Sequence, residues 1–594
     1  MARRDPHSYY DDAQPKISSF ELALRVDFGR KMLTGKAKLM FESEAEGSLN
    51  LDSRDLKIRK VSLEDGRELK YRLHPKDPVL GSLFEIQFDS PSKSVLIEYE
   101  VPENASALQW LNPSQTRGKS QPFLFSQCQA IHARSLVPIQ DSPAVRVTYT
   151  ASITVPSALT VVMAAGSAGT SEDPAKGEKT YFFKMPQPIP PYLFAFAAGR
   201  IAAKEVGPRT RIWAEPEVLD KAAYEFEETE NMIKEAEALF GPYEWERFDL
   251  LVLPPSFPYG GMENPRLTFL TPTLIAGDRS LVAVVVHELA HSWTGNLVTN
   301  ANAEHFWINE GFTVWAERRI LEKLYGTESA VMSYAQGLNS LKGALDRFGA
   351  DSPFTCLVTK LEGVNPDEVF SEVPYQKGCL FLRLLEETVS RPAWDRFIRA
   401  YIEKYRFTSI ETTELKSFIE THFPGIMEKV GGDDWLFSPG VPGNCPQIQS
   451  QRLEFISNLS AAFKHGTYPS FAEISTMNTS EKLIYLQGLG RPLSREECVW
   501  LETNFELKSV SNSEILCEWL TIAAASDYEP AFPKIKAFLS EVGRMKYLRP
   551  IYKAMANSER TRALASEIYA ATKDSLHQLS ANVIGQEIEK YGKG

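Results

Sequence analysis

The sequence predicts a multidomain α+β protein in which a β-sheet segment, a mixed α/β segment and an all-helical segment follow one another. Three patterns support this prediction: apolar–polar alternation over roughly the first 200 residues, helical spacing interrupted by buried strands after that, and a helical pattern alone towards the end. The chain has 594 residues, which is enough for about three or four domains.

The first segment, residues 1–201, is predicted to be an N-terminal β-sheet domain. The stretches "FELALRVDF" and "GKAKLMFES" alternate apolar and polar residues, and "VLIEYEV" and "VRVTYTASITV" are rich in β-branched and aromatic side chains. Turn residues separate them. Both patterns are typical of strands with one buried face.

The remaining segments change character twice. In residues 202–441, "KAAYEFEETENMIKEAEALFG" has helical spacing and a terminal glycine, and "FDLLVLPPSF" reads as a buried strand. Residues 442–450 lie in the stretch "SPGVPGNCPQIQS", whose prolines and glycines predict a linker. Residues 451–594 are predicted to be a helical domain, and short turns between its helices suit stacked helical pairs. No clean repeat period is present.

Composition limits the possible partners and location. The net charge is −12, which argues against binding nucleic acid or an anionic membrane. Six cysteines without a CxxC pair predict neither a disulfide framework nor a zinc knuckle and fit a reducing compartment. The start "MARRDPHSYYDDAQPK" does not resemble a secretory signal, and no run of about 18 apolar residues predicts membrane insertion. We therefore expect a cytoplasmic protein, and a monomer.

A candidate metal site lies in the stretch "VVVHELAHSWTGNLVTNANAEHFWINEGFTVWAER". On a helix, His287 and His291 lie one turn apart on one face, and Glu288 is placed to reach a water molecule without binding the metal itself. A catalytic zinc site needs a third protein ligand, and Glu310 on a second helix-like segment can supply it. Glu317, two turns further, could orient a ligand histidine.

An HExxH motif also arises by chance, and a buried helix pair is the alternative interpretation of this stretch. Histidine is scarce in the chain, however, with nine residues in all, yet two of them stand one turn apart in an apolar helix. The metal interpretation is therefore preferred, and zinc bound there would activate water and polarise a carbonyl. Glu288 would take the water proton and deliver it to a leaving amine. The predicted reaction is metal-assisted hydrolysis, most simply of a peptide bond.

The spacing H-E-x-x-H, 18 residues, E, together with "YGGMENP" upstream, resembles the gluzincin aminopeptidases of peptidase family M1. Longer stretches resemble, within that family, leukotriene A-4 hydrolase and aminopeptidase B: "FLFSQCQAIHARSLVPIQDSPAVRVTYTA", "LLVLPPSFPYGGMENPRLTF", "VPYQKG" and "GRMKYLRP". The resemblance extends over nearly the whole chain. It implies an N-terminal β domain, a thermolysin-like α/β catalytic domain and a C-terminal armadillo-like domain of stacked helices.

The resemblance also implies roles for single residues. The zinc ligands for one Zn²⁺ ion are His287, His291 and Glu310, with Glu288 as the base. Residues of two stretches are implied to bind the substrate. Gln127 and Gln129 would line the amine end of the pocket, and Gly260, Gly261, Met262 and Glu263 would lie along the substrate backbone. Glu263 would hold the free α-amine, since a carboxylate forms a charge-assisted bond with an ammonium group. Alternatively, "GGMEN" is a simple turn, and the two glutamines are ordinary polar residues of a strand.

Two further sites depend on the resemblance alone. Tyr375 in "VPYQKG" matches the tyrosine that donates a hydrogen bond to the tetrahedral oxyanion, although a tyrosine after proline is more often a packing residue. Arg544, with Lys546 beside it, matches the arginine that holds the substrate carboxylate; a solvated basic turn is the alternative. An arginine in this role would place the site between the catalytic domain and the C-terminal helices.

The predicted substrates are short peptides with a free N-terminus, and two other functions remain open. The first is hydrolysis of a lipid epoxide at the same zinc site, for which Asp367 matches the acid that directs water. Phe370 departs from that pattern because it stands where mammalian leukotriene A-4 hydrolase has a tyrosine in the pocket. A phenyl ring donates no hydrogen bond. The second is a binding scaffold without catalysis, which the intact ligand set and base disfavour.

Overall fold

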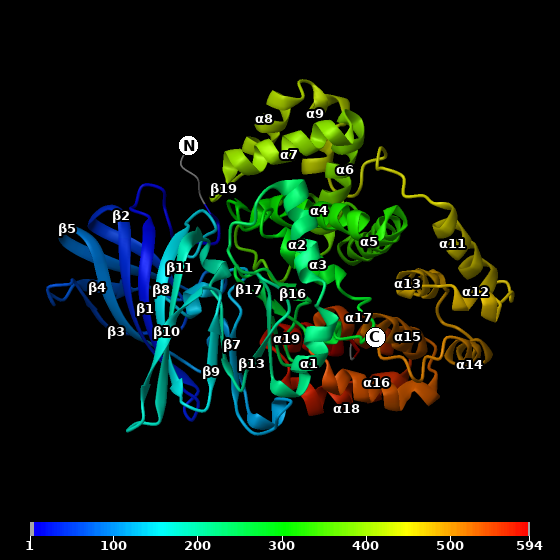
Figure 1. Cartoon of the computed structure of the whole chain (residues 1–594), viewed down its shortest axis with the longest axis horizontal. Coiled ribbons are helices and arrows are strands. Elements are labelled where there is room, and N and C mark those ends of the chain that lie inside the picture. The colour runs from blue at the N-terminus through cyan, green and yellow to red at the C-terminus, as the bar shows by residue number, and fades with distance from the viewer. Residues whose placement is uncertain (1–4, 592–594) are drawn as a thin grey trace.

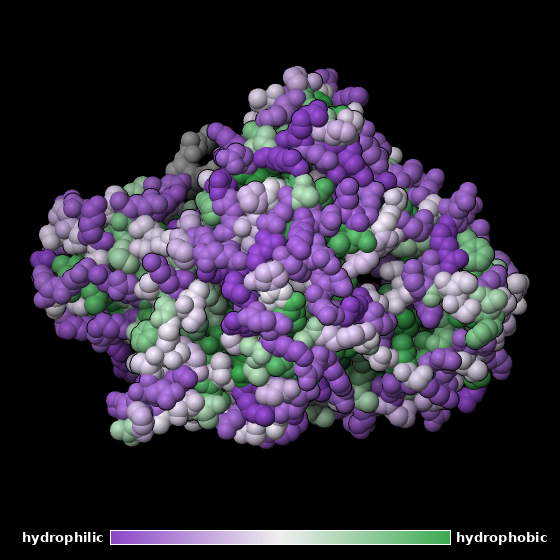
Figure 2. All heavy atoms as spheres, in the orientation of Figure 1, coloured by the Kyte–Doolittle hydropathy of each residue, from purple (hydrophilic) through white to green (hydrophobic). Residues whose placement is uncertain are grey.

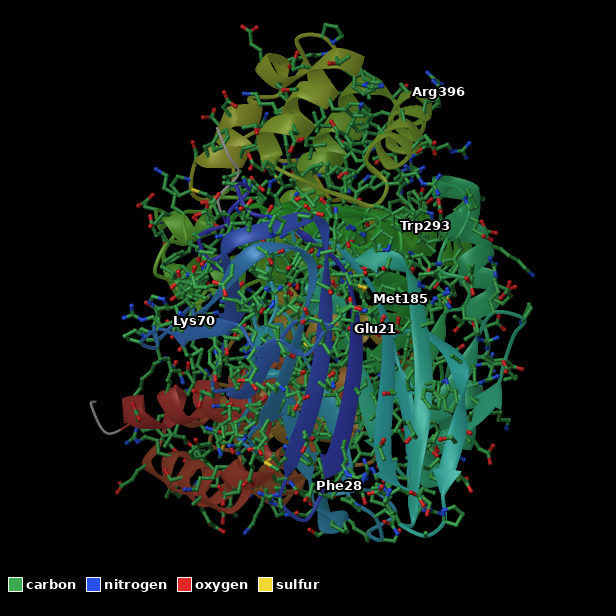
Figure 3. The ribbon with its side chains drawn as sticks, turned by 90° about the vertical axis from the view of Figure 1, so that its left-hand side faces the viewer. Glu21, Phe28, Lys70, Met185, Trp293 and Arg396 are labelled. Carbon is green, nitrogen blue, oxygen red and sulfur yellow. The ribbon has the colours of Figure 1, made fainter. Side chains whose placement is uncertain are left out.

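Two β-sheets form the N-terminal part of the protein, which a computed structural model describes from residue 5 to residue 591. The larger sheet faces the viewer in Figure 3 and contains β1 (Ile17–Asp27), β2 (Met32–Ser53), β3 (Lys57–Ser62), β4 (Lys70–Leu73), β5 (Ser82–Val101), β8 (Val147–Pro156), β10 (Gly166–Asp173) and β11 (Glu178–Ile189). The smaller sheet contains β6 (Leu108–Leu111), β7 (Phe123–Ser126), β9 (Thr160–Met163) and β12 (Phe196–Gly199).

The larger sheet has the order β10-β11-β8-β1-β2-β5-β3, with β4 also paired to β5. β1 lies antiparallel to β2, with Leu22 opposite Ala37, and parallel to β8, with Leu22 opposite Ala151. Side chains that lie opposite one another on neighbouring strands point to the same face of the sheet, and all three of these are buried. The prediction of a β-sheet N-terminal domain is confirmed.

The central part is built on a sheet with the order β13-β14-β15-β17-β16. These strands are β13 (Ala202–Glu205), β14 (Arg211–Ala214), β15 (Asp249–Val252), β16 (Gly261–Met262) and β17 (Leu267–Leu270). β15 is buried along its whole length, as the apolar stretch "FDLLVLPPSF" predicts. β16 is the edge strand and runs antiparallel to β17, so one side of its backbone has no neighbour in this sheet.

Helices make up the rest of this part: the earlier ones lie in the middle of the molecule, and the later ones project at the top of Figure 1. They are α1 (Pro216–Glu225), α2 (Thr229–Phe240), α3 (Ala283–Ala290), α4 (Trp307–Tyr325), α5 (Thr327–Phe348), α6 (Gly378–Val389), α7 (Arg391–Tyr405), α8 (Thr412–His422), α9 (Ile426–Lys429) and α10 (Gly432–Phe437). A small parallel pair joins β18 (Val298–Asn300), which lies between α3 and α4 in the sequence, to β19 (Thr408–Ile410), which lies between α7 and α8; the sequence patterns did not predict it.

The stretch predicted as one helix around residue 222 is divided into α1 and α2. The carboxylate of Glu225, at the last position of α1, accepts hydrogen bonds from the backbone N–H groups of Gly277 and Arg279, both at 2.8 Å. Thr229 begins α2 and donates its hydroxyl to the carbonyl of Phe226 at 2.6 Å, which closes the turn between them. The break thus combines a local hydrogen bond with tertiary contacts of Glu225, which the periodicity of the stretch does not reveal. The glycine predicted at the end of the stretch does end α2.

The C-terminal part is helical, as predicted. Its helices are α11 (Gln451–Phe463), α12 (Phe471–Ser475), α13 (Thr479–Gly488), α14 (Arg495–Asn504), α15 (Ser513–Ala525), α16 (Phe532–Glu541), α17 (Met545–Met555), α18 (Glu559–Thr572) and α19 (Gln578–Lys590). The odd-numbered helices pack in series from α11 to α19, and α16 packs on α18. The result is a curved stack of helical pairs (Figure 1).

The turn between α16 and α17 joins this stack to the edge of the central sheet. The backbone N–H of Gly543 donates to the carbonyl of Pro255 at 2.8 Å, and that of Met545 donates to Pro258 at 2.9 Å. A Cβ atom at Gly543 would lie 2.6 Å from the Pro255 oxygen, so glycine permits this approach. The C-terminal helices are thereby fixed directly beside β16.

Hydrophilic residues cover most of the face seen in Figure 2, with smaller apolar areas over the C-terminal helices. None of the helices described between residues 5 and 591 combines the length and the apolar character that crossing a bilayer requires.

The predicted domain limits, 1–201, 202–441 and 451–594 with a linker at 442–450, stay predictions. Two observations are compatible with them. β12 belongs to the smaller N-terminal sheet and β13 to the central sheet, and residues 438–450 contain no helix or strand.

Close packing of α4 against α6 gives a testable prediction. A methyl group at Gly311 would meet the Gly378 Cα at 2.9 Å and the Pro374 carbonyl oxygen at 3.1 Å. Because both neighbours are backbone atoms, Gly311→Ala is expected to destabilise the protein by about 1–3 kcal/mol, measured by urea denaturation. Gly343→Ala on the exposed side of α5 is the control, since a Cβ there meets nothing within 4 Å. Equal losses in both variants would contradict this account of the contact.

Candidate metal centre and substrate cleft

The predicted ligand histidines lie at the end of the buried helix α3. Val285, Val286 and Leu289 are completely buried, and this packing fixes the helix in the interior. His287 is in its last turn, and His291 is the first residue after it, still with helical backbone angles of φ −54° and ψ −24°. Glu310 stands in the first turn of α4, which packs against α3.

Three ligand atoms converge between these helices. The two histidine Nε2 atoms are 3.1 Å apart, and Oε2 of Glu310 is 3.4 Å from Nε2 of His287 and 3.5 Å from Nε2 of His291. Nδ1 of His287 faces a carboxylate, and Nδ1 of His291 faces the Thr294 carbonyl at 3.2 Å, so Nδ1 is the donor nitrogen in each ring. Both Nε2 atoms therefore face one another and a carboxylate oxygen.

This convergence of two imidazoles and one carboxylate brings together three atoms that could bind one metal ion. Oε2 of Glu310 is buried and has no hydrogen-bond partner among the described residues, which fits a ligand atom. Burial lowers the pKa of His291 to about 4, so this ring stays neutral and available as a ligand. Two imidazoles and one carboxylate with an open position are the donor set of a catalytic zinc ion. The residues present thus fit the metal.

A carboxylate behind the site orients His287. Oε2 of Glu317 lies 3.1 Å from Nδ1 of His287, and Oε1 of Glu317 accepts a hydrogen bond from the buried guanidinium of Arg318. The positive charge of Arg318 and the bond from His287 hold the pKa of Glu317 below its usual range against the effect of burial. The ionised carboxylate therefore selects the His287 tautomer that presents Nε2 to the metal.

The predicted base, Glu288, lies against the edge strand. A Cβ atom at Gly261 would fall 2.3 Å from Oε1 of Glu288, so only glycine at this position leaves space for the carboxylate. Burial raises the pKa of Glu288 well above its usual range, and the nearby carboxylates of Glu263 and Glu310 add to this rise. A carboxylate with a raised pKa is suited to accept and return a proton near neutral pH.

Glu263 follows β16 directly and is 4% exposed. Its Oε1 has no hydrogen-bond partner among the described residues, and its backbone carbonyl accepts from Asn296 Nδ2 at 2.8 Å. Burial, with repulsion from Glu310 as the second cause, raises its pKa to about 8. A buried carboxylate with a free oxygen is costly unless a cationic or hydrogen-bonding group meets it. Besides Glu288, Glu310 and Glu317, the site thus contains a further buried carboxyl group, and its free oxygen needs a hydrogen-bond donor.

Tyr375 lies in a short π-helix, Val373–Lys377, immediately before α6. Its ring stacks beside His287 with a centroid distance of 6.1 Å and makes edge contacts with Phe306 at 6.0 Å and Phe370 at 5.8 Å. Burial raises the pKa of Tyr375 well above its usual range, so the hydroxyl keeps its proton. A fixed, protonated phenol beside the ligand histidines can donate to an oxyanion.

Arg544 and Lys546 take different positions. Nη2 of Arg544 would lie 2.6 Å from a Cβ at Gly260, so its guanidinium lies against the edge strand, and its buried Nε has no partner among the described residues. Nη1 donates to the hydroxyl of Tyr547 at 2.8 Å. Lys546 instead binds Glu514 at 2.7 Å, and its side chain is 56% exposed. Arg544 therefore reaches the site, whereas Lys546 lies at its rim.

A cavity of about 100 Å³ opens beside these groups. Its wall includes Gln129, Asp367 and Phe370 of the predicted residues, together with Tyr259 and Asn309. The other predicted glutamine, Gln127, is buried and donates to the sulfur of Met262 at 3.2 Å. Gln127 thus contacts the edge strand through Met262, whereas Gln129 lines the cavity.

Three residues at the site were not predicted from the sequence. Asn309 precedes Glu310, lines the cavity and donates to the Tyr192 hydroxyl at 3.2 Å. Asn296 holds the backbone of Glu263, and His132 binds Oδ2 of Asp367 through Nε2 at 2.9 Å. Each stands inside or beside a stretch that carries the family resemblance, but no local spacing marks its role.

A buried His₂Glu donor set with a base and an edge strand defines the class of metal-dependent peptide hydrolases, and comparison with known proteins agrees. Three family models match: the "Peptidase M1 N-terminal domain" over residues 8–193, the "Peptidase family M1 domain" over 224–432, and "Leukotriene A4 hydrolase, C-terminal" over 477–588. The chain belongs to peptidase family M1, with the C-terminal domain of the leukotriene A-4 hydrolase group.

Relatives match over nearly the full length. Leukotriene A-4 hydrolase of Xenopus laevis is 38% identical over 98% of this chain and 99% of its own, and leucine aminopeptidase 2 of Yarrowia lipolytica is 36% identical over 99% and 94%. The structure of yeast LTA4 hydrolase in complex with bestatin superimposes with a TM-score of 0.91, at 30% identity, over 99% of this chain and 97% of that one. The predicted family and three-part architecture are confirmed.

The contact between Glu317 and His287 gives a second prediction. Glu317→Gln is expected to weaken zinc binding by about 10–100-fold, because the amide no longer fixes the His287 tautomer as a charged acceptor. Competition with a chromogenic chelator measures this directly. Glu322→Gln, on the same helix but paired with Arg391 at the surface, should bind zinc as the wild type does. Unchanged affinity in Glu317→Gln would remove this orienting role.

Proposed function

We propose that this protein is a zinc-dependent aminopeptidase that removes the N-terminal residue from short peptides. The observation that carries the proposal is Glu263, a buried carboxylate with an unpartnered oxygen, placed after the edge strand and near the ligand trio. A free α-amine is the group that such a carboxylate recognises. Because Glu263 stands at a fixed distance from the reacting centre, it would admit one residue before the scissile bond.

Substrate binding would use the edge strand. The free backbone side of β16 can pair with an extended peptide, and Gly260 and Gly261 allow its close approach. Arg544 beside Gly260 would bind the carboxylate at the other end of a short peptide. Because that arginine lies on the C-terminal helices, the cleft between the two domains would limit the length of the substrate. The first side chain would enter the cavity lined by Gln129 and Tyr259.

The chemistry would be divided between the zinc ion and two side chains. Zinc held by His287, His291 and Glu310 would supply Lewis-acid activation of water and of the scissile carbonyl. Glu288 would accept the proton of the attacking water and return it to the departing amine. Tyr375 would donate a hydrogen bond to the oxygen that becomes negatively charged. We also propose a monomeric, cytoplasmic protein; the six unpaired cysteines support a reducing compartment.

One experiment tests the central claim. Release of the first residue is followed from two forms of one tripeptide, one with a free amine and one N-acetylated, with and without a zinc chelator. Cleavage of only the free-amine form, abolished by the chelator and restored by zinc, is the expected result. Cleavage of both forms would indicate an endopeptidase, and cleavage of neither would leave the proposal without support.

The role of Glu288 has its own prediction. Glu288→Gln keeps the size and position of the side chain but removes the proton acceptor, so kcat is expected to fall by at least about 10²–10⁴-fold. Zinc content, measured by atomic emission, should stay at the wild-type level because Glu288 is not a ligand. Activity within a few-fold of wild type would eliminate the base assignment.

The role of Glu263 is tested through the substrate. Glu263→Gln removes the negative charge that would meet the ammonium, so KM for the free-amine tripeptide is expected to rise by about 10–100-fold, the equivalent of one buried charge-assisted bond. Asn264→Ser, at the next position, changes no carboxylate and serves as the control. A KM that rises equally in both variants would point to general disturbance of the strand end.

A second candidate activity is the hydrolysis of a lipid epoxide at the same site. Asp367 and apolar side chains such as Phe306 and Leu361 share the cavity wall, and the Xenopus laevis relative bears the name leukotriene A-4 hydrolase. Phe370 disfavours this activity, because its ring offers no hydroxyl where the mammalian enzyme has one. Incubation with a lipid epoxide followed by chromatography decides the question: a diol formed by zinc-loaded enzyme supports it, and only spontaneous products reject it.

A further inference from the structure

The first residues that the structure describes line the same cavity that would receive the substrate. Asp5 and His7 form part of its wall, together with Pro143 from the N-terminal domain and Leu361 and Asp367 from the catalytic domain. Asp5 is 6% and His7 1% exposed, so both side chains are interior groups. The motifs that predict the zinc site give no indication that a segment about 280 residues earlier in the sequence reaches this space.

A buried ion network holds this segment in place. The guanidinium of Arg134, which is completely buried, donates to the His7 carbonyl at 2.7 Å and to the Asp141 carboxylate at 2.9 Å. Asp5 accepts a hydrogen bond from Ser142 Oγ at 2.6 Å. Asp52 accepts from the backbone N–H of Tyr9 at 2.8 Å. Because each of these polar groups is paired in the interior, the segment has one well-defined position.

From this position His7 reaches across to the catalytic domain. Its Nε2 lies 2.9 Å from the carbonyl oxygen of Val364, and since a carbonyl only accepts, this nitrogen is the donor. Val364 belongs to the loop between Leu361 and Phe370, and both of these residues and Asp367 line the cavity. The imidazole thus fills part of the wall and also fixes the loop that forms another part.

We propose that His7 is a specificity-determining residue, which limits the size of the first side chain by filling the cavity wall and by positioning the loop 361–370. This inference rests on the proposed aminopeptidase function, because it assumes that the first side chain enters this cavity. Its physical basis is steric: in a packed pocket, the volume left by the wall decides which side chains fit without strain.

Two opposite substitutions test the proposal. The ratio of kcat/KM for tryptophanyl to alanyl p-nitroanilide is measured for the wild type, His7→Ala and His7→Trp. His7→Ala enlarges the cavity and is expected to raise the ratio by about tenfold, whereas His7→Trp fills it and should lower the ratio by a similar factor. His7→Gln keeps a donor for the Val364 carbonyl and should lie closer to the wild type than His7→Ala does. Zinc content and thermal midpoint are recorded for every variant.

His74→Ala is the matched control. This histidine belongs to the same domain, pairs with Glu85 at 2.8 Å and is not part of the cavity wall. A ratio that is unchanged in both His7→Ala and His7→Trp, in an active enzyme, overturns the inference while leaving the aminopeptidase proposal intact. An equal loss for both substrates likewise assigns His7 a purely structural role. If the wild type cleaves neither substrate but both are cleaved by a known aminopeptidase, the proposed function itself fails.

Discussion

The structure depends on one electrostatic constraint: two imidazole lone pairs and a carboxylate oxygen converge in the interior within 3.5 Å of one another. A metal ion between them could be bound by all three atoms at once. Two packed helices must hold them there, and the tautomer of each histidine must be fixed from behind. The apolar character of α3, the contact between Gly311 and Gly378, and the Arg318–Glu317 pair all serve this requirement.

A second constraint is the placement of Glu263 and Arg544, the two side chains proposed to bind the ends of the substrate. Glu263 follows the edge strand β16, and Arg544 stands in the turn directly before α17. Two backbone hydrogen bonds from that turn to Pro255 and Pro258 fix the second position relative to the first. The C-terminal helices therefore act on the chemistry indirectly: by closing the cleft they would restrict the enzyme to short peptides.

The N-terminal domain contributes to the same space from a third direction. Gln129 and His132 stand on the segment that follows β7, and the first described residues of the chain lie beside it. His132 binds Asp367 and His7 binds the backbone of Val364, so two histidines of one domain hold one loop of another. The cavity wall is thus assembled from segments that are far apart in the sequence, and its volume depends on how the domains pack.

The sequence by itself determined the order of sheet, mixed and helical parts, and it identified the ligand and base candidates. It could do so because strand alternation, helical spacing and the HExxH motif are local patterns, each read within a few residues. The interruption between α1 and α2, the β18–β19 pair and the roles of Asn296, Asn309 and His132 could not be predicted this way. Only the tertiary structure decided them, since each depends on a partner distant in sequence, whose position follows from packing rather than from spacing. The different positions of Arg544 and Lys546, two residues apart, have the same cause: both pair with Glu514, but only Arg544 also lies against Gly260.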